Sequence, residues 1–141
     1  MSVEENKALV QRYVDGICSH GDMGWVDEVF ARECVLHNPA VPVPLQGIEA
    51  LKGFIAAIYG AFPDFGVAQE DLIVTEDKVA FRSVVSGTFK GDFAGIPPTG
   101  KHTTWEAMGI YRIKDGKIAE IWESLDLLGA WQRLGVLPGL G

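Results

Sequence analysis

The chain has 141 residues, 48% of them hydrophobic, and a formal net charge of -7 at pH 7. This length predicts one domain over residues 1–141 with a sizeable core. The acidic balance argues against nucleic acid and anionic membranes as partners, because both are bound by basic surfaces. The sequence shows no apolar run of membrane-spanning length and no signal-peptide pattern. We therefore expect a cytoplasmic protein that binds a small neutral or weakly charged molecule.

The first part of the chain predicts three helices. Ser2 and Glu5 have the spacing of a capping box, and apolar residues then recur at helical spacing up to Gly21. Asp22 is a candidate cap for a short second helix that includes Phe30. Beyond it, the pattern predicts a short strand at 33–39, a proline-rich loop at 40–47 and a third helix from about 48 to 59.

From residue 67 the apolar pattern changes to a period of two, which is typical of half-buried strands. Turn signals predict two hairpins, and a longer loop separates them. The expected strands are 67–75, 78–89, 102–113 and 117–126, followed by one or two helical turns at 127–135. Helices grouped ahead of strands predict an α+β fold, with three helices packed on one face of a curved, mostly antiparallel sheet. Such a cone-shaped arrangement favours a ligand cavity at its open end.

The last expected strand carries the first candidate functional residue. Because side chains alternate along a strand, its two faces differ in polarity. One face holds Ala119, Ile121, Glu123 and Leu125, and the other holds Ile118, Glu120, Trp122, Ser124 and Asp126. Glu123 is the only polar group on an otherwise apolar face. Burial raises the pKa of a carboxyl group, which suits a general acid or base. The structural alternatives are an ion pair with Arg82 or Arg112, or a solvated strand end.

Several sequence segments, taken in order, resemble one known family. They are HNP at 37–39, GIEALKGF at 47–54, FPD at 62–64, DKVAFR at 77–82, SGTFKGDFAGIPPTGK at 86–101, IYRIKDGKIAEIW at 110–122 and DLLGAWQRLG at 126–135. Together these segments resemble the SnoaL-like polyketide cyclases, within the nuclear transport factor 2-like superfamily of cystatin-like rolls. The resemblance extends over essentially the whole chain.

The resemblance implies a cavity on the concave face of the sheet, in which a carboxylate on the last strand acts as general acid and base. That carboxylate matches Glu123, although the family commonly has Asp there and often has His in place of Ile121. The implied reaction is the intramolecular aldol cyclisation of a polyketide-like substrate, without a metal or cofactor. We also expect a homodimer, formed through the convex or edge surface of the sheet.

Two further residues are candidates for acid/base chemistry. Asp126 stands where the last strand ends, so its side chain either turns toward the cavity or caps the closing helix. His102 begins a strand after the PPTGK loop, so it lies either at the cavity rim or in solvent.

Substrate-binding candidates come from several expected elements. His37 and Asn38 follow the short strand, where the resemblance to epoxide hydrolases implies a water-holding asparagine; the alternative is a local turn before Pro39. The aromatic candidates are Tyr13, Phe54, Tyr59, Trp105 and Tyr111, which either stack on a flat substrate or pack in the core.

Two other functions fit the same fold. One is a ligand-binding or scaffolding module without turnover. The other is epoxide hydrolysis, for which the resemblance implies an arginine and a carboxylate two positions later. Here Arg82 is present as a candidate anchor for a substrate oxygen, but Val84 occupies the second position. The sequence therefore ranks the cyclase first.

Overall fold

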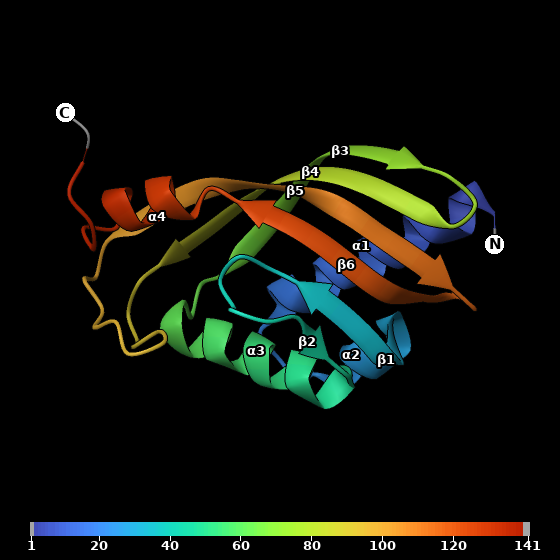
Figure 1. Ribbon diagram of the computed structural model, residues 1–141, viewed down its shortest axis with the longest axis horizontal. Coiled ribbons are helices and arrows are strands. Elements are labelled where there is room, and N and C mark those ends of the chain that lie inside the picture. The colour runs from blue at the N-terminus through green and yellow to red at the C-terminus, as the bar shows by residue number, and fades with distance from the viewer. Residues whose placement is uncertain (1, 140–141) are drawn as a thin grey trace.

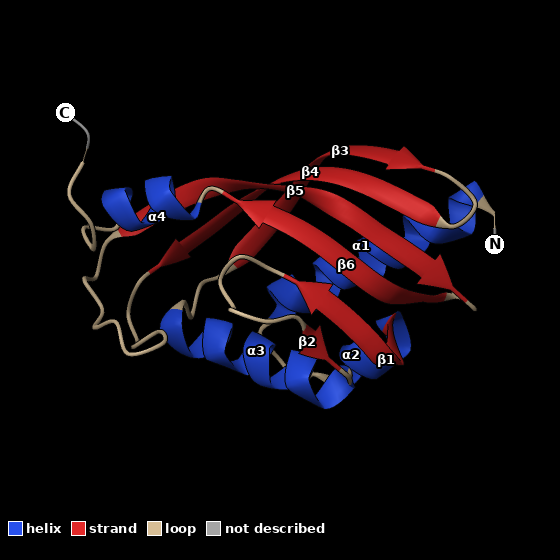
Figure 2. Cartoon of the chain, viewed as in Figure 1, coloured by secondary structure: helices blue, strands red, loops and turns tan. Residues whose placement is uncertain are grey.

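The computed structural model describes residues 2–139 of the chain. Its helices are α1 (Val3–Ser19), α2 (Gly24–Val29), α3 (Ile48–Ala61) and α4 (Leu127–Arg133). Its strands are β1 (Phe30–His37), β2 (Leu45–Gln46), β3 (Gly66–Val74), β4 (Lys78–Thr88), β5 (His102–Lys114) and β6 (Lys117–Leu125). The sheet arches over α1, α2 and α3, and α4 lies at one end (Figure 1, Figure 2). This confirms the predicted α+β fold. Within residues 2–139, no helix is long and apolar enough to cross a membrane.

The strands form one six-stranded sheet in the order β2-β1-β6-β5-β4-β3. Neighbouring strands run antiparallel except β1 and β6, which run parallel. The parallel pair places the first long strand of the chain beside the last one, with His37 opposite Trp122. As a result, the segment that leaves β1 lies next to the second half of β6.

The core lies between the concave face of the sheet and the helices. Burial alternates along β4 and β5, as expected for strands with one solvated face. Val79 and Tyr111 of the sheet, Leu9 of α1 and Ile55 of α3 are all buried. The inner face is thus apolar and enclosed, while the charged residues of the same strands point outward.

The start of α1 has the predicted capping residue, whereas the capping position of α2 is one residue later than predicted. Ser2 Oγ accepts a hydrogen bond from the backbone N–H of Glu5 at 3.1 Å, so Ser2 is the N-cap of α1. The carboxylate of Asp22 accepts from the N–H of Gly24 at 2.9 Å, but the capping position itself belongs to Met23. Phe30 starts β1 instead of extending α2, so its place in the second helix was predicted wrongly.

Two local predictions are wrong because they depend on how strands pair, which the pattern within one strand does not show. The proline-rich loop contains the short strand β2, which pairs with β1. Ile118 was assigned to the face of Glu120, but it is fully buried and lies opposite Ile113 on the inner face. A bulge with one extra residue, Ala119, reverses the alternation there. From Glu120 onward the predicted alternation holds.

Candidate active site

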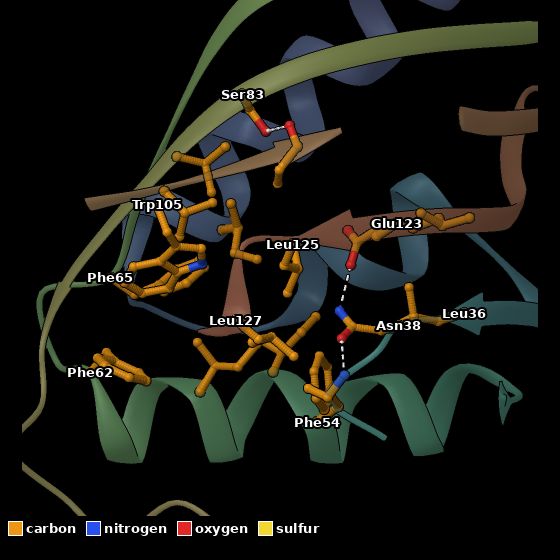
Figure 3. A pocket seen from close by; sticks show the side chains of 18 of the residues that line it. Leu36, Asn38, Phe54, Phe62, Phe65, Ser83, Trp105, Glu123, Leu125 and Leu127 are labelled. Carbon is orange, nitrogen blue, oxygen red and sulfur yellow. Dashed lines mark hydrogen bonds between the residues drawn. The ribbon is translucent and has the colours of Figure 1, made fainter. Parts of the chain in front are cut away.

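A cavity of about 110 Å³ lies between the concave face of the sheet and helices α1, α3 and α4. Most of its lining is aliphatic or aromatic, as in Figure 3. The lining residues with polar side-chain atoms are Tyr13, Asn38, Ser83, Trp105, Tyr111, Glu123 and Trp131. In the described part of the chain, no lysine, arginine or histidine lines this cavity. It is therefore an apolar site with few polar groups and one ionisable carboxyl group.

Glu123 enters the cavity from β6, where it lies opposite Gly109 of β5. Both arginines proposed as its structural partners bind other acids. Arg82 Nε lies 2.8 Å from Asp71 Oδ2, and Arg112 Nη2 lies 3.2 Å from Glu120 Oε1. Glu123 thus has no cationic partner among residues 2–139.

The surroundings of Glu123 raise its pKa from 4.5 to about 7, and desolvation by burial is the cause. Its side chain keeps some accessible surface, because it faces the cavity, but protein atoms surround the carboxyl group. The hydrogen bond from Asn38 lowers the pKa and offsets part of the desolvation. At neutral pH both protonation states of Glu123 are therefore populated, as general acid/base chemistry requires.

Asn38 is buried at the end of β1 and makes two directed hydrogen bonds. Its Nδ2 donates to Glu123 Oε2 at 2.6 Å, and its Oδ1 accepts from the backbone N–H of Ala40 at 2.8 Å (Figure 3). The bond from Ala40 occupies the carbonyl oxygen, so the NH₂ group is the one that faces Glu123. The two sequence-based alternatives for Asn38, a local turn and a place in the cavity, thus occur together.

Two tyrosine hydroxyl groups share the cavity with Glu123. Burial raises the pKa of Tyr13 and of Tyr111, and the nearby Glu123 carboxylate raises both further. Their rings are 5.7 Å apart between centroids. Both phenols therefore stay protonated at neutral pH and remain available as hydrogen-bond donors.

Sequence reasoning overlooked Ser83, and it considered Tyr111 only for stacking. Ser83 is buried in β4 and lines the cavity between Phe81 and Val85. The signal was present, since strand alternation places residues 79, 81, 83 and 85 on one face. Trp105, an expected aromatic candidate, does line the cavity.

The structure moves the two secondary acid/base candidates away from the cavity. Asp126 caps α4, where its Oδ1 accepts from the N–H of Gly129 at 2.9 Å. His102 is exposed, and its Nδ1 lies 2.8 Å from the hydroxyl of Thr88. Neither side chain lines the cavity, because the strand end turns Asp126 into the helix cap and His102 starts β5 on its solvated face.

Three substrate-binding candidates also lie outside the cavity lining. Tyr59 donates its hydroxyl to the carbonyl oxygen of Ile17 at 2.7 Å, which fixes it between helices. Arg82 lies on the convex face of β4, because β4 buries its odd-numbered residues. His37 points outward at the end of β1, where it meets Glu120.

The cavity offers few groups to a metal ion or a charged cofactor. Within residues 2–139, no three His, Cys, Asp or Glu side chains gather closely enough to hold a metal ion. What the cavity does provide is one carboxyl group of shifted pKa, one oriented amide, two phenols, the Ser83 hydroxyl and two indole rings.

The comparisons with known proteins agree on one family. The profile of the SnoaL-like polyketide cyclases matches residues 7–134. The aklanonic acid methyl ester cyclases DnrD of Streptomyces peucetius and DauD of Streptomyces sp. (strain C5) are each 30% identical over 102 residues, which is 70% of this chain. The matches cover 66% of DnrD and 60% of DauD, less than two thirds of each relative.

The solved structure of TsrD from Streptomyces laurentii superimposes on this chain with a TM-score of 0.86 at 28% identity. That match covers 97% of this chain and 99% of TsrD. The profile match, the sequence relatives and the fold lead to the same conclusion. The chain belongs to the SnoaL-like polyketide cyclase family.

Proposed function

We propose that this chain catalyses the intramolecular aldol cyclisation of an uncharged, polyketide-like molecule, with Glu123 as general acid and base. The observation that carries this proposal is the carboxyl group itself. It faces an apolar cavity, has no cationic partner in the described chain, and has a pKa of about 7. Membership in the SnoaL-like family supports the same chemistry.

The reaction begins with Glu123 in its carboxylate form, which removes a proton from a carbon flanked by carbonyl groups. The electron pair of that C–H bond forms an enolate. The enolate carbon then bonds to a second carbonyl carbon of the same molecule, and the π electrons of that carbonyl group move to its oxygen. Protonated Glu123 returns its proton to this oxygen. The ring closes without loss of any atom, and Glu123 is regenerated.

The neutral donors around Glu123 support this sequence of steps. Asn38 donates to the carboxylate and holds one of its oxygens, which leaves the other free to face the substrate. Tyr13 and Tyr111 remain protonated, so their hydroxyls can donate to oxygens that gain negative charge during the reaction. Trp105 offers an aromatic wall for a flat substrate.

The charge of the cavity favours an uncharged substrate. A free carboxylic acid bound beside Glu123 would bring a second negative charge into an apolar site that has no lysine, arginine or histidine in its described lining. An ester avoids that repulsion. The names of DnrD and DauD specify a methyl ester, which agrees with this requirement.

Two other functions rank below this one. The family relatives do not favour a ligand-binding module without turnover. Epoxide hydrolysis lacks its second acid, since Val84 follows Arg82 on the convex face. The expected homodimer stays a prediction, and the exposed side chains of Met108, Ile110 and Trp122 on β5 and β6 provide an apolar surface for it.

The test compares Glu123→Gln with a matched control, Glu106→Gln, which removes an exposed carboxylate from the outer face of β5. Aklanonic acid methyl ester serves as the first probe, with product detected by mass spectrometry. Glutamine keeps the shape of Glu123 but cannot exchange the proton, so we expect turnover to fall by about a hundredfold or more. The control should keep the rate of the unmodified protein.

Thermal melts verify that both variants fold. Equal turnover by folded Glu123→Gln and unmodified protein would show that Glu123 is not the base. If the unmodified protein binds neutral esters and releases them unchanged, the ligand-binding function takes first place.

A further inference from the structure

A charged cluster lies on the outer side of the sheet, directly behind the candidate active site. His37 Nε2 donates to Glu120 Oε2 at 2.6 Å. The imidazole ring of His37 also stacks on Trp122: the two ring planes are parallel, and the ring centroids are 5.4 Å apart. Arg112 donates to the other oxygen of Glu120 from Nε and Nη2, at 3.3 and 3.2 Å. These contacts join the end of β1 to β6 and, through Arg112, to β5.

The next residue in the chain is Asn38, which contacts Glu123 from the opposite side of β1. His37 is the last residue of β1 paired with β6, so the strand ladder does not hold Asn38. After Asn38 the chain turns, with the N–H of Val41 donating to the carbonyl oxygen of Asn38 at 3.1 Å. The position of Asn38 therefore depends on the turn after it and on His37 before it.

Asn38 also lies between the cavity and a second, more open hollow. Asn38 and Glu123 line the cavity, and both also line an open groove on the outer side between the proline-rich loop and the exposed face of β5 and β6. This outer groove is lined by His37, Asn38, Pro39, Val41, Pro42, Val43, Pro44, Met108, Gly109, Ile110, Trp122, Glu123 and Ser124. The hydrogen bond from Asn38 to Glu123 therefore lies where the cavity and the groove meet.

We propose that His37 is a positioning residue of the active site: its bond to Glu120 and its stacking on Trp122 hold the end of β1 so that Asn38 donates to Glu123. The inference rests on the acid/base function proposed for Glu123. It assigns His37 a place outside the cavity and a function that acts through Asn38, without contact with the substrate.

The experiment follows the Glu123 carboxyl group by carbon-13 NMR during a pH titration, so it needs no substrate. His37→Phe keeps an aromatic ring over Trp122 but has no donor for Glu120. His37→Gln keeps a donor and serves as the conservative control. Both substitutions are made in the unmodified chain and in Asn38→Leu, with Asn38→Ala as a second background if the leucine variant does not fold.

Loss of the Asn38 bond removes a donor that stabilises the carboxylate, so Asn38→Leu should lower the acid dissociation constant of Glu123 by about tenfold. His37→Phe should also lower the acid dissociation constant of Glu123, by about threefold to tenfold. In His37→Gln the constant should stay close to that of the unmodified protein. In either Asn38 background, neither His37 substitution should change the constant. Such non-additivity is what an effect transmitted through Asn38 predicts.

Three outcomes would overturn the proposal: an unchanged Glu123 titration in His37→Phe, the same change in His37→Gln, or equal changes with and without Asn38. A purely structural effect of His37 would alter the melting temperature, but it would not make the change in the Glu123 titration depend on Asn38. Failure of the proposed function has a different signature, namely no turnover by the unmodified protein while the titrations behave as expected.

Discussion

Two glutamates on β6, three residues apart, have opposite surroundings. Glu120 lies on the outer face, where the bond from His37 and the Arg112 guanidinium lower its pKa. Glu123 lies on the inner face, where burial raises its pKa to about 7 and one neutral amide donates to it. Residue type and strand are the same, so the difference arises from the face of the sheet alone.

The comparison shows how this fold makes a reactive carboxyl group. Arg82 and Arg112 of the sheet point outward, and each pairs with an acid of the outer face: Arg112 with Glu120, and Arg82 with Asp71. Within the described residues, no lysine, arginine or histidine lines the cavity on the inner face. The same separation that gives Glu120 two basic partners leaves Glu123 desolvated and without a cationic partner within the described chain. Three predictions test this contrast.

The largest effect is expected from Glu123→Gln on stability. A carboxyl group whose pKa is higher in the folded state than in the unfolded state binds its proton more tightly when folded. Its contribution to stability is fully present below about pH 4.5 and is lost as pH rises through about 7. The variant lacks this loss, so its stability relative to the unmodified protein should increase by about 3 kcal/mol between pH 4 and pH 8.

Urea unfolding at pH 4, 6 and 8, followed by tryptophan fluorescence, measures this difference. Glu106→Gln serves as the control for loss of one negative charge. If the difference between the Glu123 variant and the unmodified protein does not change with pH, the carboxyl group is solvated and the proposed general base loses its physical support.

Glu120→Gln should show the opposite and smaller dependence on pH. Because His37 and Arg112 lower the pKa of Glu120, its ionised form stabilises the fold above its unfolded-state pKa, and that contribution is lost as pH falls through the folded-state value. The variant should be less stable than the unmodified protein at pH 7, by about 1 kcal/mol or less, which is typical of partly exposed ion pairs. At low pH the difference should vanish.

The same urea titrations provide the measurement. A loss of stability that persists at low pH would mean that Glu120 acts through packing and not through its charge. A gain at neutral pH would remove the contrast between the two glutamates.

The sequence predicted the fold and the placement of Glu123 because both depend on local periodicity. Alternation along β6 singled out Glu123, and helices grouped ahead of strands indicated the α+β class. Periodicity could not show the bulge at Ala119, which depends on pairing with β5 and moved Ile118 to the inner face. It also could not show that β1 pairs with β6, the contact that brings Asn38 to Glu123.

For His102 and Asp126 the sequence left two positions open, because contacts outside a single strand decide between them. In the structure His102 takes the solvated position beside Thr88, and Asp126 takes the capping position at Gly129. Arg82 was considered as a partner of Glu123, although the alternation of β4 already places it beside Val84 and away from Phe81 and Val85.

The smallest effect is expected from Arg82→Ala on turnover. Arg82 lies on the convex face and donates to Asp71 at 2.8 Å, so it cannot reach a substrate in the cavity. The inner position next to it belongs to Ser83, a neutral group that cannot supply the second acid of an epoxide hydrolase. We therefore expect Arg82→Ala to keep the cyclisation rate of the unmodified protein. We also expect neither protein to convert limonene-type epoxides to diols above the buffer control, as measured by gas chromatography. Diol formation that disappears in Arg82→Ala and in Glu123→Gln would require Arg82 to face the cavity, and it would place epoxide hydrolysis ahead of cyclisation.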